Sequence, residues 1–158
     1  MKIALGADHA GYELKDQIKQ HLQSKGIEVQ DEGTSSPESV DYPDFAAKVA
    51  LDVQRRRAEL GILVCGSGIG MAIAANKVAG IRAANVSSEY EAQMSREHNN
   101  ANVLALGARI VKPEVALGIV DKWLATGFAG GRHERRVEKI TDIEKQQDAS
   151  AAVGTQRP

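Results

Sequence analysis

The chain's only cysteine, Cys65, lies where an apolar run meets a glycine-rich turn, in the stretch LGILVCGSGIGMAIAANK from Leu60 to Lys77. A thiolate can remove a proton from carbon, and amide groups at the start of a helix can stabilise it. The same amides can stabilise an oxyanion that forms on a substrate. A lone cysteine among apolar residues is also typical of a small core side chain. The residue type alone leaves both interpretations open.

The turn after the cysteine has the pattern G-x-G-x-G and consists of Gly66, Ser67, Gly68, Ile69 and Gly70. Glycine lets backbone amides approach an anion closely, and a following helix adds its positive end. A tight strand-to-helix turn explains the glycines equally well. The turn is not a P-loop, because no Gly-Lys-Ser/Thr follows, and Met71 occupies the last position of a dinucleotide fingerprint.

Two further pairs of residues suit an anionic ligand. Asp8 and His9 follow the N-terminal apolar run, where they either cap the next helix or hold a sugar hydroxyl and pair an imidazolium with phosphate. Arg132 and Arg136 are four residues apart, which places two guanidiniums on one helix face. That pair suits a phosphate, although a solvated charged helix also explains it.

Short apolar runs that alternate with helical patterns must position these side chains. Five runs are predicted to be strands, at residues 2–8, 27–33, 60–66, 81–87 and 102–108. They predict a three-layer α/β/α fold with a doubly wound (Rossmann or flavodoxin-like) five-stranded parallel sheet. We expect the strand order 2-1-3-4-5, with the third run in the centre and the more polar second run near an edge.

The remaining segments predict helices and one tail. Ser88 and Glu91 form a possible capping box for a helix that ends near Glu97, and Pro113 suits the first turn of the next helix. A charged helix follows the Gly130-Gly131 pair. We predict one domain over residues 1–147 and a flexible C-terminal tail over 148–158, where no apolar period remains.

In a doubly wound sheet, ligands bind beyond the carboxyl ends of the strands, where the strand order reverses. Asp8 and His9 should therefore meet the turn after Cys65. His98 and Asn99 precede the fifth strand and should lie at the opposite end of the sheet or on its flank. They are either part of a solvated helix end or reach the site of a neighbouring subunit, and Arg109 can face the same interface.

Composition excludes several classes of protein. The 158 residues are 42 % apolar and 26 % charged, with a net charge of −1, so no global basic field points to nucleic acid. No apolar run is long enough for a membrane span, and the N-terminus predicts a strand instead of a signal peptide. One cysteine without zinc-like spacing suits a reducing compartment, and we expect a cytoplasmic protein without a metal.

Four motifs together resemble the type B ribose-5-phosphate isomerase family, which is related to galactose-6-phosphate isomerase subunits. They are GADHAG, CGSGIG, EHNNANVLALGAR and GGRHERRVEKI, and the resemblance covers about residues 1–145. It implies an enzyme without metal or cofactor that interconverts D-ribose 5-phosphate and D-ribulose 5-phosphate through an enediolate, in the non-oxidative pentose phosphate pathway. It also implies a homodimer, or a dimer of dimers, whose active sites are shared between subunits.

The resemblance implies a role for each matching residue. Cys65 corresponds to the base that moves a proton between C2 and C1, and His98 to the acid/base that opens the furanose ring. The turn from Gly66 to Gly70 corresponds to the loop whose amides hold the enediolate oxygen. The other contacts are Asp8 near the ring oxygen and hydroxyls, His9, Arg132 and Arg136 at the phosphate, Asn99 and Arg109 from the partner subunit, and Tyr42 in the pocket lining.

Two positions depart from parts of the family. Ser67 stands where many members with the cysteine base have threonine, and Met71 stands where another branch has a glutamate base, so the chain resembles the cysteine branch. Two other functions remain as alternatives. One is the same chemistry on a tetrose or hexose 6-phosphate, such as erythrulose, allose or galactose phosphate. The other is a non-catalytic nucleotide or flavin binder.

Overall fold

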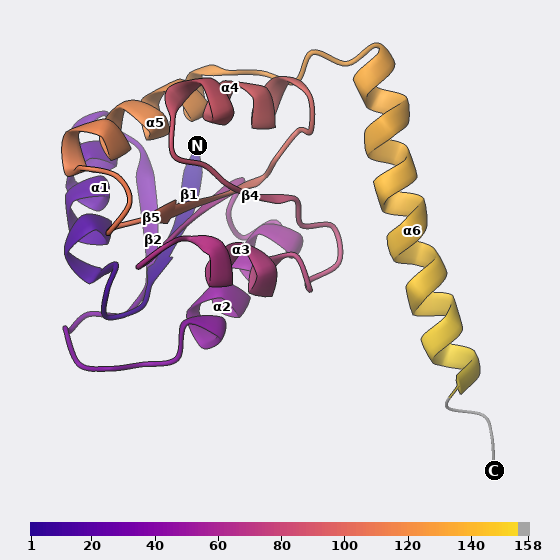
Figure 1. Cartoon of the computed structure of the whole chain (residues 1–158), viewed down its shortest axis with the longest axis horizontal. Coiled ribbons are helices and arrows are strands. Elements are labelled where there is room, and N and C mark those ends of the chain that lie inside the picture. Colours follow the sequence, from indigo (N-terminus) through magenta and orange to yellow (C-terminus); the bar gives the residue numbers. More distant parts are fainter. Residues whose placement is uncertain (155–158) are drawn as a thin grey trace.

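The computed structural model describes residues 1–154, in which a parallel sheet alternates with helices (Figure 1). The strands are β1 (Lys2–Ala7), β2 (Glu28–Gly33), β3 (Leu60–Cys65), β4 (Ala83–Asn85) and β5 (Val103–Gly107). The helices are α1 (Tyr12–Ser24), α2 (Tyr42–Gln54), α3 (Ile69–Ala75), α4 (Glu89–Glu97), α5 (Pro113–Ala125) and α6 (Arg132–Gly154). The predicted α/β class and the all-parallel sheet are confirmed.

The strand order is β2-β1-β3-β5-β4, so the expected order 2-1-3-4-5 is wrong in its last two positions. Burial explains the difference. Every residue of β5 is buried, whereas β4 has three residues that are partly or fully exposed. The longer, wholly apolar strand therefore takes the interior place beside β3, and the short strand takes the edge. As predicted, β3 is central and the polar β2 lies at the other edge.

Helices cover both faces of the sheet and form two hydrophobic cores. One core joins α1, α4 and α5 to the sheet and includes Ile18, Leu104 and Trp123, each fully buried. The other joins α2 and α3 to the opposite face through small side chains such as Ala46 and Ala75. Figure 1 shows the two helix layers on either side of the strands. This arrangement leaves the ends of the strands open for ligands.

Local signals place the helix starts near the expected positions. Ser88 is the N-cap of α4, and its hydroxyl oxygen accepts the Glu91 amide at 3.2 Å, which confirms the predicted capping box. Pro113 opens α5, as its missing amide hydrogen allows. Both features fix the positions at which α4 and α5 leave the sheet.

Helix α6 stands apart from the sheet and its helix layers (Figure 1). None of its described residues, 132–154, is buried. The helix continues through Gly154, so the first part of the predicted tail, 148–154, is helical and exposed. The rest of the predicted tail, 155–158, lies outside the described residues.

Candidate active site

A cavity of about 570 Å³ lies at the carboxyl ends of β1, β3 and β5, and we call it the Cys65 cavity. Its lining residues are Asp8, Tyr42, Cys65, Gly66, Ser67, Ile69, Gly70, Ile73, Arg109 and Ile110. Eight of these were predicted from the sequence as site residues. The cavity lies where the strand order reverses between β1 and β3, which is where ligands were expected to bind.

The thiol of Cys65 ends the central strand and is only 5 % exposed. The Gly68 amide donates a hydrogen bond to its Sγ over 3.1 Å. Gly68 has a φ of 79°, and a Cβ there would lie 2.9 Å from the Leu106 carbonyl carbon, so a glycine is required for this turn. The turn thus holds the sulfur in place at the end of the central strand.

Two side chains from outside the turn contact its glycines. A Cβ on Gly66 would lie 3.1 Å from Nη1 of Arg109, and a Cβ on Gly70 would lie 2.6 Å from the Tyr42 ring. The Arg109 amide also donates to the Gly66 carbonyl over 3.0 Å. Arg109 was expected to reach a partner's site, but it reaches the cavity of its own chain, because β5 lies beside β3 and not at the edge.

Asp8 and His9 are both held by backbone amides. Asp8 is 7 % exposed, and its Oδ1 accepts the Ala10 and Gly11 amides at 2.9 and 3.0 Å. Asp8 therefore holds the turn before α1, but the N-cap of α1 is Gly11 and no side chain caps it, so the helix-capping interpretation is wrong. No described hydrogen bond uses Oδ2 of Asp8. His9 accepts the Val40 amide at Nδ1 over 3.2 Å, from the loop between β2 and α2.

The remaining predicted residues gather at a different place. His98 follows α4, five residues before β5 starts, whereas Cys65 pairs with Gly107 at the far end of that strand. The length of β5 alone is about 13 Å at ~3.3 Å per residue, so the expected separation within one chain is confirmed. The His98 ring stacks on His133, with ring centroids 4.2 Å apart and an angle of 11° between planes.

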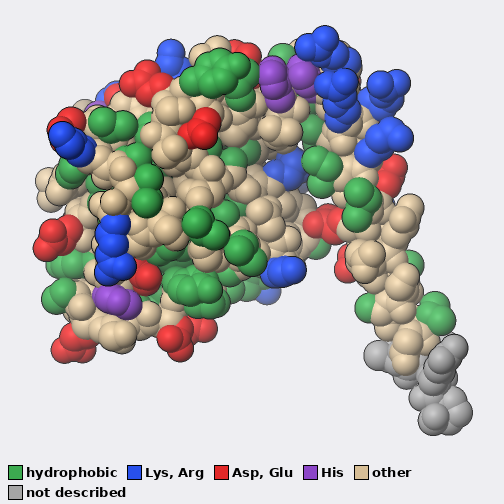
Figure 2. Space-filling model, viewed as in Figure 1, with side chains coloured by type: hydrophobic (Ala, Val, Ile, Leu, Met, Phe, Trp, Pro, Cys, Tyr) green, Lys and Arg blue, Asp and Glu red, His purple; other side chains and the backbone are tan. Residues whose placement is uncertain are grey.

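We call His98, Arg132, His133 and Arg136 the His98 cluster. Figure 2 shows histidine side chains beside a group of basic side chains at the start of α6. Partial loss of hydration, then the charges of His98, Arg132 and Arg136, lower the pKa of His133 below its usual value. The cluster is thus a strongly basic, largely exposed surface that suits a phosphate.

Two half-buried arginines fix the turn that carries His98 and Asn99. Arg82 donates to the carbonyl oxygens of Asn99 and Asn100 over 2.9 to 3.1 Å. Arg96 donates to the Ala101 carbonyl and lies 5.3 Å from the Trp123 ring centre. These guanidiniums hold carbonyl groups of the turn after α4, whereas backbone amides satisfy the last carbonyls of the helix itself.

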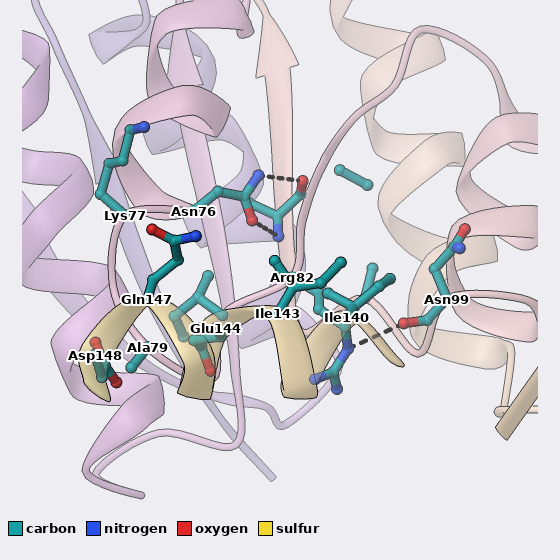
Figure 3. Close-up of a pocket in the computed structure, with 14 residues that line it drawn as sticks. Asn76, Lys77, Ala79, Arg82, Asn99, Ile140, Ile143, Glu144, Gln147 and Asp148 are labelled. Carbon is teal, nitrogen blue, oxygen red and sulfur yellow. Dashed lines mark hydrogen bonds between the residues drawn. The ribbon is translucent and has the colours of Figure 1, made fainter. Parts of the chain in front are cut away.

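A second cavity, of about 690 Å³, separates α6 from the segments around β4. Ile140, Ile143 and Glu144 project from α6 toward the segment that carries Arg82 (Figure 3). Asn99 lines this cavity and is the only predicted site residue that does. The structure therefore brings most of the predicted site together around Cys65, but leaves His98, Asn99 and the arginine pair of α6 outside it.

Sequence reasoning did not single out three contributors. His133 lies inside the quoted motif GGRHERRVEKI, next to Arg132, so its position in a helix with Arg136 was a usable signal. Ile73 and Ile110 are more than half exposed and line the Cys65 cavity. Their exposure gave no signal in the sequence, because isolated isoleucines usually indicate core positions.

Within residues 1–154, no helix combines the length and the apolar character needed to cross a membrane. The same residues contain no group of three or more His, Cys, Asp or Glu side chains arranged to hold a metal ion.

Comparison with known proteins supplies a family and close relatives. The profile of the Ribose/Galactose Isomerase family matches residues 3–140. Ribose-5-phosphate isomerase B of Escherichia coli K12 is 53 % identical over 147 residues, 93 % of this chain and 99 % of the relative. The structure of Clostridium thermocellum ribose-5-phosphate isomerase B has a TM-score of 0.92 and 56 % identity, covering 93 % of this chain and 99 % of that one.

One relative is named for a different sugar phosphate. The D-erythrulose-4-phosphate isomerase of Pectobacterium atrosepticum is 46 % identical over 148 residues, which cover 93 % of this chain and 97 % of the relative. Similar sequences over nearly the whole chain therefore carry names for four- and five-carbon substrates.

Proposed function

The chain belongs to the ribose/galactose isomerase family, and we propose that it interconverts D-ribose 5-phosphate and D-ribulose 5-phosphate through an enediolate. The observation that carries the proposal is the Cys65 thiol, held by the Gly68 amide at the wall of a cavity of about 570 Å³. A buried base with amide donors around it suits the removal of a proton beside a carbonyl.

The proposed proton transfer needs only groups of the Cys65 cavity. The Cys65 thiolate removes the C2 proton of the open-chain aldose, and the electron pair moves through the new C1–C2 double bond onto O1. Amides of the turn from Gly66 to Gly70 stabilise that oxyanion. The hydroxyl proton passes from O2 to O1, the C2–O2 double bond forms as the C1–C2 double bond breaks, and the thiol returns its proton to C1. The Gly68 amide already donates to Sγ in the free protein, so it assists the base before the oxyanion forms.

The rest of the substrate would be held by charged and polar side chains. Asp8 and Asn99 are assigned to the hydroxyls, with Tyr42 in the pocket lining. Arg109 lies in the same cavity and brings a positive charge to its rim. A phosphate fixed at a distance from the reacting carbons would orient C1 and C2 toward Sγ.

We further propose that a second copy of the chain supplies the His98 cluster and Asn99. The separation of Cys65 from His98 within one chain supports this, because no side chain can span the length of β5. In such a dimer, His98 would open the furanose ring and Arg132 with Arg136 would bind the phosphate. The shared site is the reason for expecting a homodimer, or a dimer of dimers. The single cysteine is the reason for expecting a cytoplasmic protein.

A second candidate substrate is a sugar phosphate of another length. The relative named D-erythrulose-4-phosphate isomerase favours this alternative, because it matches nearly the whole chain. Tyr42, Ile73 and Ile110 line the cavity and limit its length, so they would decide between four-, five- and six-carbon substrates.

The experiment that tests the proposal is a substrate panel on the purified full-length protein. We expect the highest kcat/KM for ribose 5-phosphate among four-, five- and six-carbon aldose phosphates, and loss of turnover in Cys65→Ala. The matched control is His21→Gln, on α1 and remote from the cavity, where His21 contacts Asp121 at 2.8 Å. A preference for a non-pentose, or near-full activity in Cys65→Ala, would overturn the main assignment or the assigned base, respectively.

A further inference from the structure

Helix α6 carries both arginines proposed for the substrate phosphate, yet the fold gives it little support. None of the residues 132–154 is buried. The helix follows Gly130 and Gly131, which have φ of 66° and 58°, and a Cβ at either would meet nothing within 4 Å. A helix that begins after such an open glycine pair can change its direction easily. The direction of α6 must therefore be set by contacts along its length.

These contacts lie on one face of α6. Among its described residues, four are partly buried and the rest are exposed, and the four are His133, Val137, Thr141 and Glu144. Spacings of three and four residues place side chains on the same side of a helix. Arg132 and Arg136 each precede one of the four, so they are rotated by about 100° from it. The contact face therefore sets the direction in which both arginines point.

Two side chains of this face make described contacts with other segments. At the start of α6, the His133 ring stacks on His98 with ring centroids 4.2 Å apart. Further along, the Glu144 carboxylate accepts the Gly80 amide, with Oε1 and Oε2 at 2.9 and 3.0 Å from the nitrogen. The two contacts lie about 16.5 Å apart along the helix, at a rise of ~1.5 Å per residue. A helix held at one point can swing, whereas two separated points fix its direction.

The segment that receives Glu144 is itself firmly held. The Gly80 carbonyl accepts Nδ2 of Asn102 over 2.8 Å, and Oδ1 of Asn102 accepts the Arg82 amide over 2.8 Å. Asn102 directly precedes β5, so these bonds connect Gly80 to the sheet. Burial lowers the pKa of Arg82, and the negative charge of Glu144, which lines the same cavity (Figure 3), opposes this effect. The contact with Glu144 needs only the backbone amide of Gly80, which every residue except proline supplies.

We propose that Glu144 is a positioning residue for the substrate phosphate, because its carboxylate fixes the direction of α6 and thereby of Arg132 and Arg136. This inference rests on the proposed function, which assigns the phosphate to these two arginines. The negative charge of Glu144 acts against anion binding nearby. Any favourable effect of Glu144 on phosphate binding must therefore come from geometry.

The first test measures the affinity of the full-length protein for inorganic phosphate by isothermal titration calorimetry. If charge alone mattered, removal of a carboxylate would strengthen the binding of an anion. We expect the opposite for Glu144→Ala, whose Kd should rise about tenfold because the arginines lose their fixed direction. Glu144→Gln keeps an oxygen that accepts the Gly80 amide, so its Kd should rise less, about threefold. An unchanged or lower Kd in Glu144→Ala would overturn the proposal.

Asp142→Ala is the matched control. Asp142 is exposed on the same helix, about 160° around the axis from Glu144, and the substitution removes the same charge. It should leave the Kd for phosphate unchanged or lower it slightly. Equal increases of Kd in Asp142→Ala and Glu144→Ala would assign the effect to α6 in general, and Glu144 would then have no special role.

The second test observes the contact and its consequence for turnover. We expect the Gly80 amide to exchange its hydrogen about tenfold faster in Glu144→Ala than in the wild type or in Asp142→Ala, as measured by NMR on ¹⁵N-labelled protein. KM for ribose 5-phosphate should rise with Kd, while kcat stays within about threefold, because Cys65 lies at the other end of the sheet. Weaker phosphate binding with unchanged exchange at Gly80, or a loss of kcat at unchanged KM, would contradict the positioning role.

The outcomes separate this role from the proposed function. If the wild-type protein isomerises no sugar phosphate, the proposed function fails, while the affinity for inorganic phosphate and the exchange at Gly80 still decide the role of Glu144. If the wild type turns over ribose 5-phosphate and Glu144→Ala binds phosphate as tightly as the wild type does, the positioning role fails and the proposed function stands.

Discussion

The two ends of the sheet hold chemically active side chains in different ways. At the carboxyl end, Cys65 is 5 % exposed, and backbone amides of its own turn contact the thiol. At the amino end, the His98 cluster lies on an exposed helix terminus and on α6, which has no buried residue among those described. One end is organised by the backbone of a single chain, whereas the other presents side chains outward.

The two ends would therefore contribute differently to the proposed reaction, one to proton transfer and the other to phosphate binding and ring opening. Proton transfer at carbon needs a base fixed within a fraction of an ångström, which a strand end and a tight turn provide. Phosphate binding and ring opening tolerate groups that become ordered on assembly. We therefore expect the exposed end to gain its order from a second surface, and the predictions below test how independent the two ends are.

The largest effect is expected from mixing two inactive variants. Cys65→Ala and His98→Ala should each lose turnover about a hundredfold or more. If each site combines Cys65 of one chain with His98 of the other, a mixed dimer has one intact site and should recover about half of the wild-type activity. The measurement is isomerase activity of mixed dimers, isolated after co-expression with two different affinity tags.

The control for complementation places both substitutions in one chain. A dimer of Cys65→Ala/His98→Ala with wild type would have one substitution in each site and should stay inactive. Failure of the mixed single variants to regain activity, in a sample shown to be dimeric, would place a complete site in one chain. A monomeric protein with full activity would contradict the shared site outright.

The second largest effect is expected at Gly68, in the backbone-organised end. Gly68→Ala adds a Cβ 2.9 Å from the Leu106 carbonyl carbon and strains a residue with φ of 79°. We expect kcat to fall about a hundredfold, because the amide that contacts Cys65 is displaced. Gly80 has the same φ of 79°, but a Cβ there meets nothing within 4 Å.

Gly80→Ala is therefore a matched control that separates backbone strain from damage to the site. Each substitution should lower the free energy of unfolding by about 1 kcal/mol through the unfavourable φ, and Gly68→Ala should lower it further because its Cβ meets the backbone at Leu106. Only Gly68→Ala should also lower kcat. Thermal unfolding and steady-state kinetics of the two variants would check this, and equal losses of kcat would contradict the role of the Gly68 amide.

The sequence predicted which residues meet around Cys65, although it predicted the order of β4 and β5 wrongly. Asp8, Cys65 and the glycine turn follow the first and third strands, which were placed correctly, so their meeting needed no knowledge of later strands. The four-motif resemblance to the family is confirmed over residues 3–140. The individual roles of the site residues remain predictions.

The expected strand order placed β5 at the edge of the sheet, and this error gave Arg109 a wrong expected location. With β5 at the edge, Arg109 would lie two strands from Cys65, and a partner subunit was the natural destination. In the structure Cys65 pairs with Gly107, and the Ala108 amide donates to the Cys65 carbonyl over 2.8 Å. Strand length and burial decide this order, since β4 has only three residues. The sequence predicted β4 over seven residues, which concealed its weakness as an interior strand.

Two contacts that depend on the path of the chain between helices and strands could not be predicted. The Val40 amide on His9 depends on the path of a loop whose residues carry no signal for that contact. The His98–His133 stack depends on the angle at which α6 leaves the Gly130-Gly131 pair, which has positive φ at both residues. Such angles depend on tertiary contacts, which are not periodic along the chain.

A smaller effect is expected at Arg82, which supports the exposed end without belonging to the His98 cluster. Arg82→Gln removes donors from the carbonyls of Asn99 and Asn100, so the turn beside His98 should loosen. We expect kcat/KM to fall about tenfold, as for loss of one or two hydrogen bonds from a charged donor. Ring-opened substrate should be affected less than cyclic substrate, because His98 acts on the ring.

The matched control for Arg82 is Arg55→Gln, at an exposed arginine that ends α2. It changes the net charge by the same amount and should leave kcat/KM unchanged. If both variants lose activity equally, the overall charge of the protein would explain the effect, and Arg82 would have no positioning role.

The smallest effect is expected in the titration of His133. Lost hydration and the charges of His98, Arg132 and Arg136 lower its pKa, while Glu97 opposes them. His98→Asn removes one of the positive charges, so the pKa of His133 should rise back toward the ordinary histidine value of about 6.5. Proton NMR titration of the imidazole signals measures the change directly. An unchanged pKa of His133 would contradict a charge interaction between the two rings, which would then be held by packing alone.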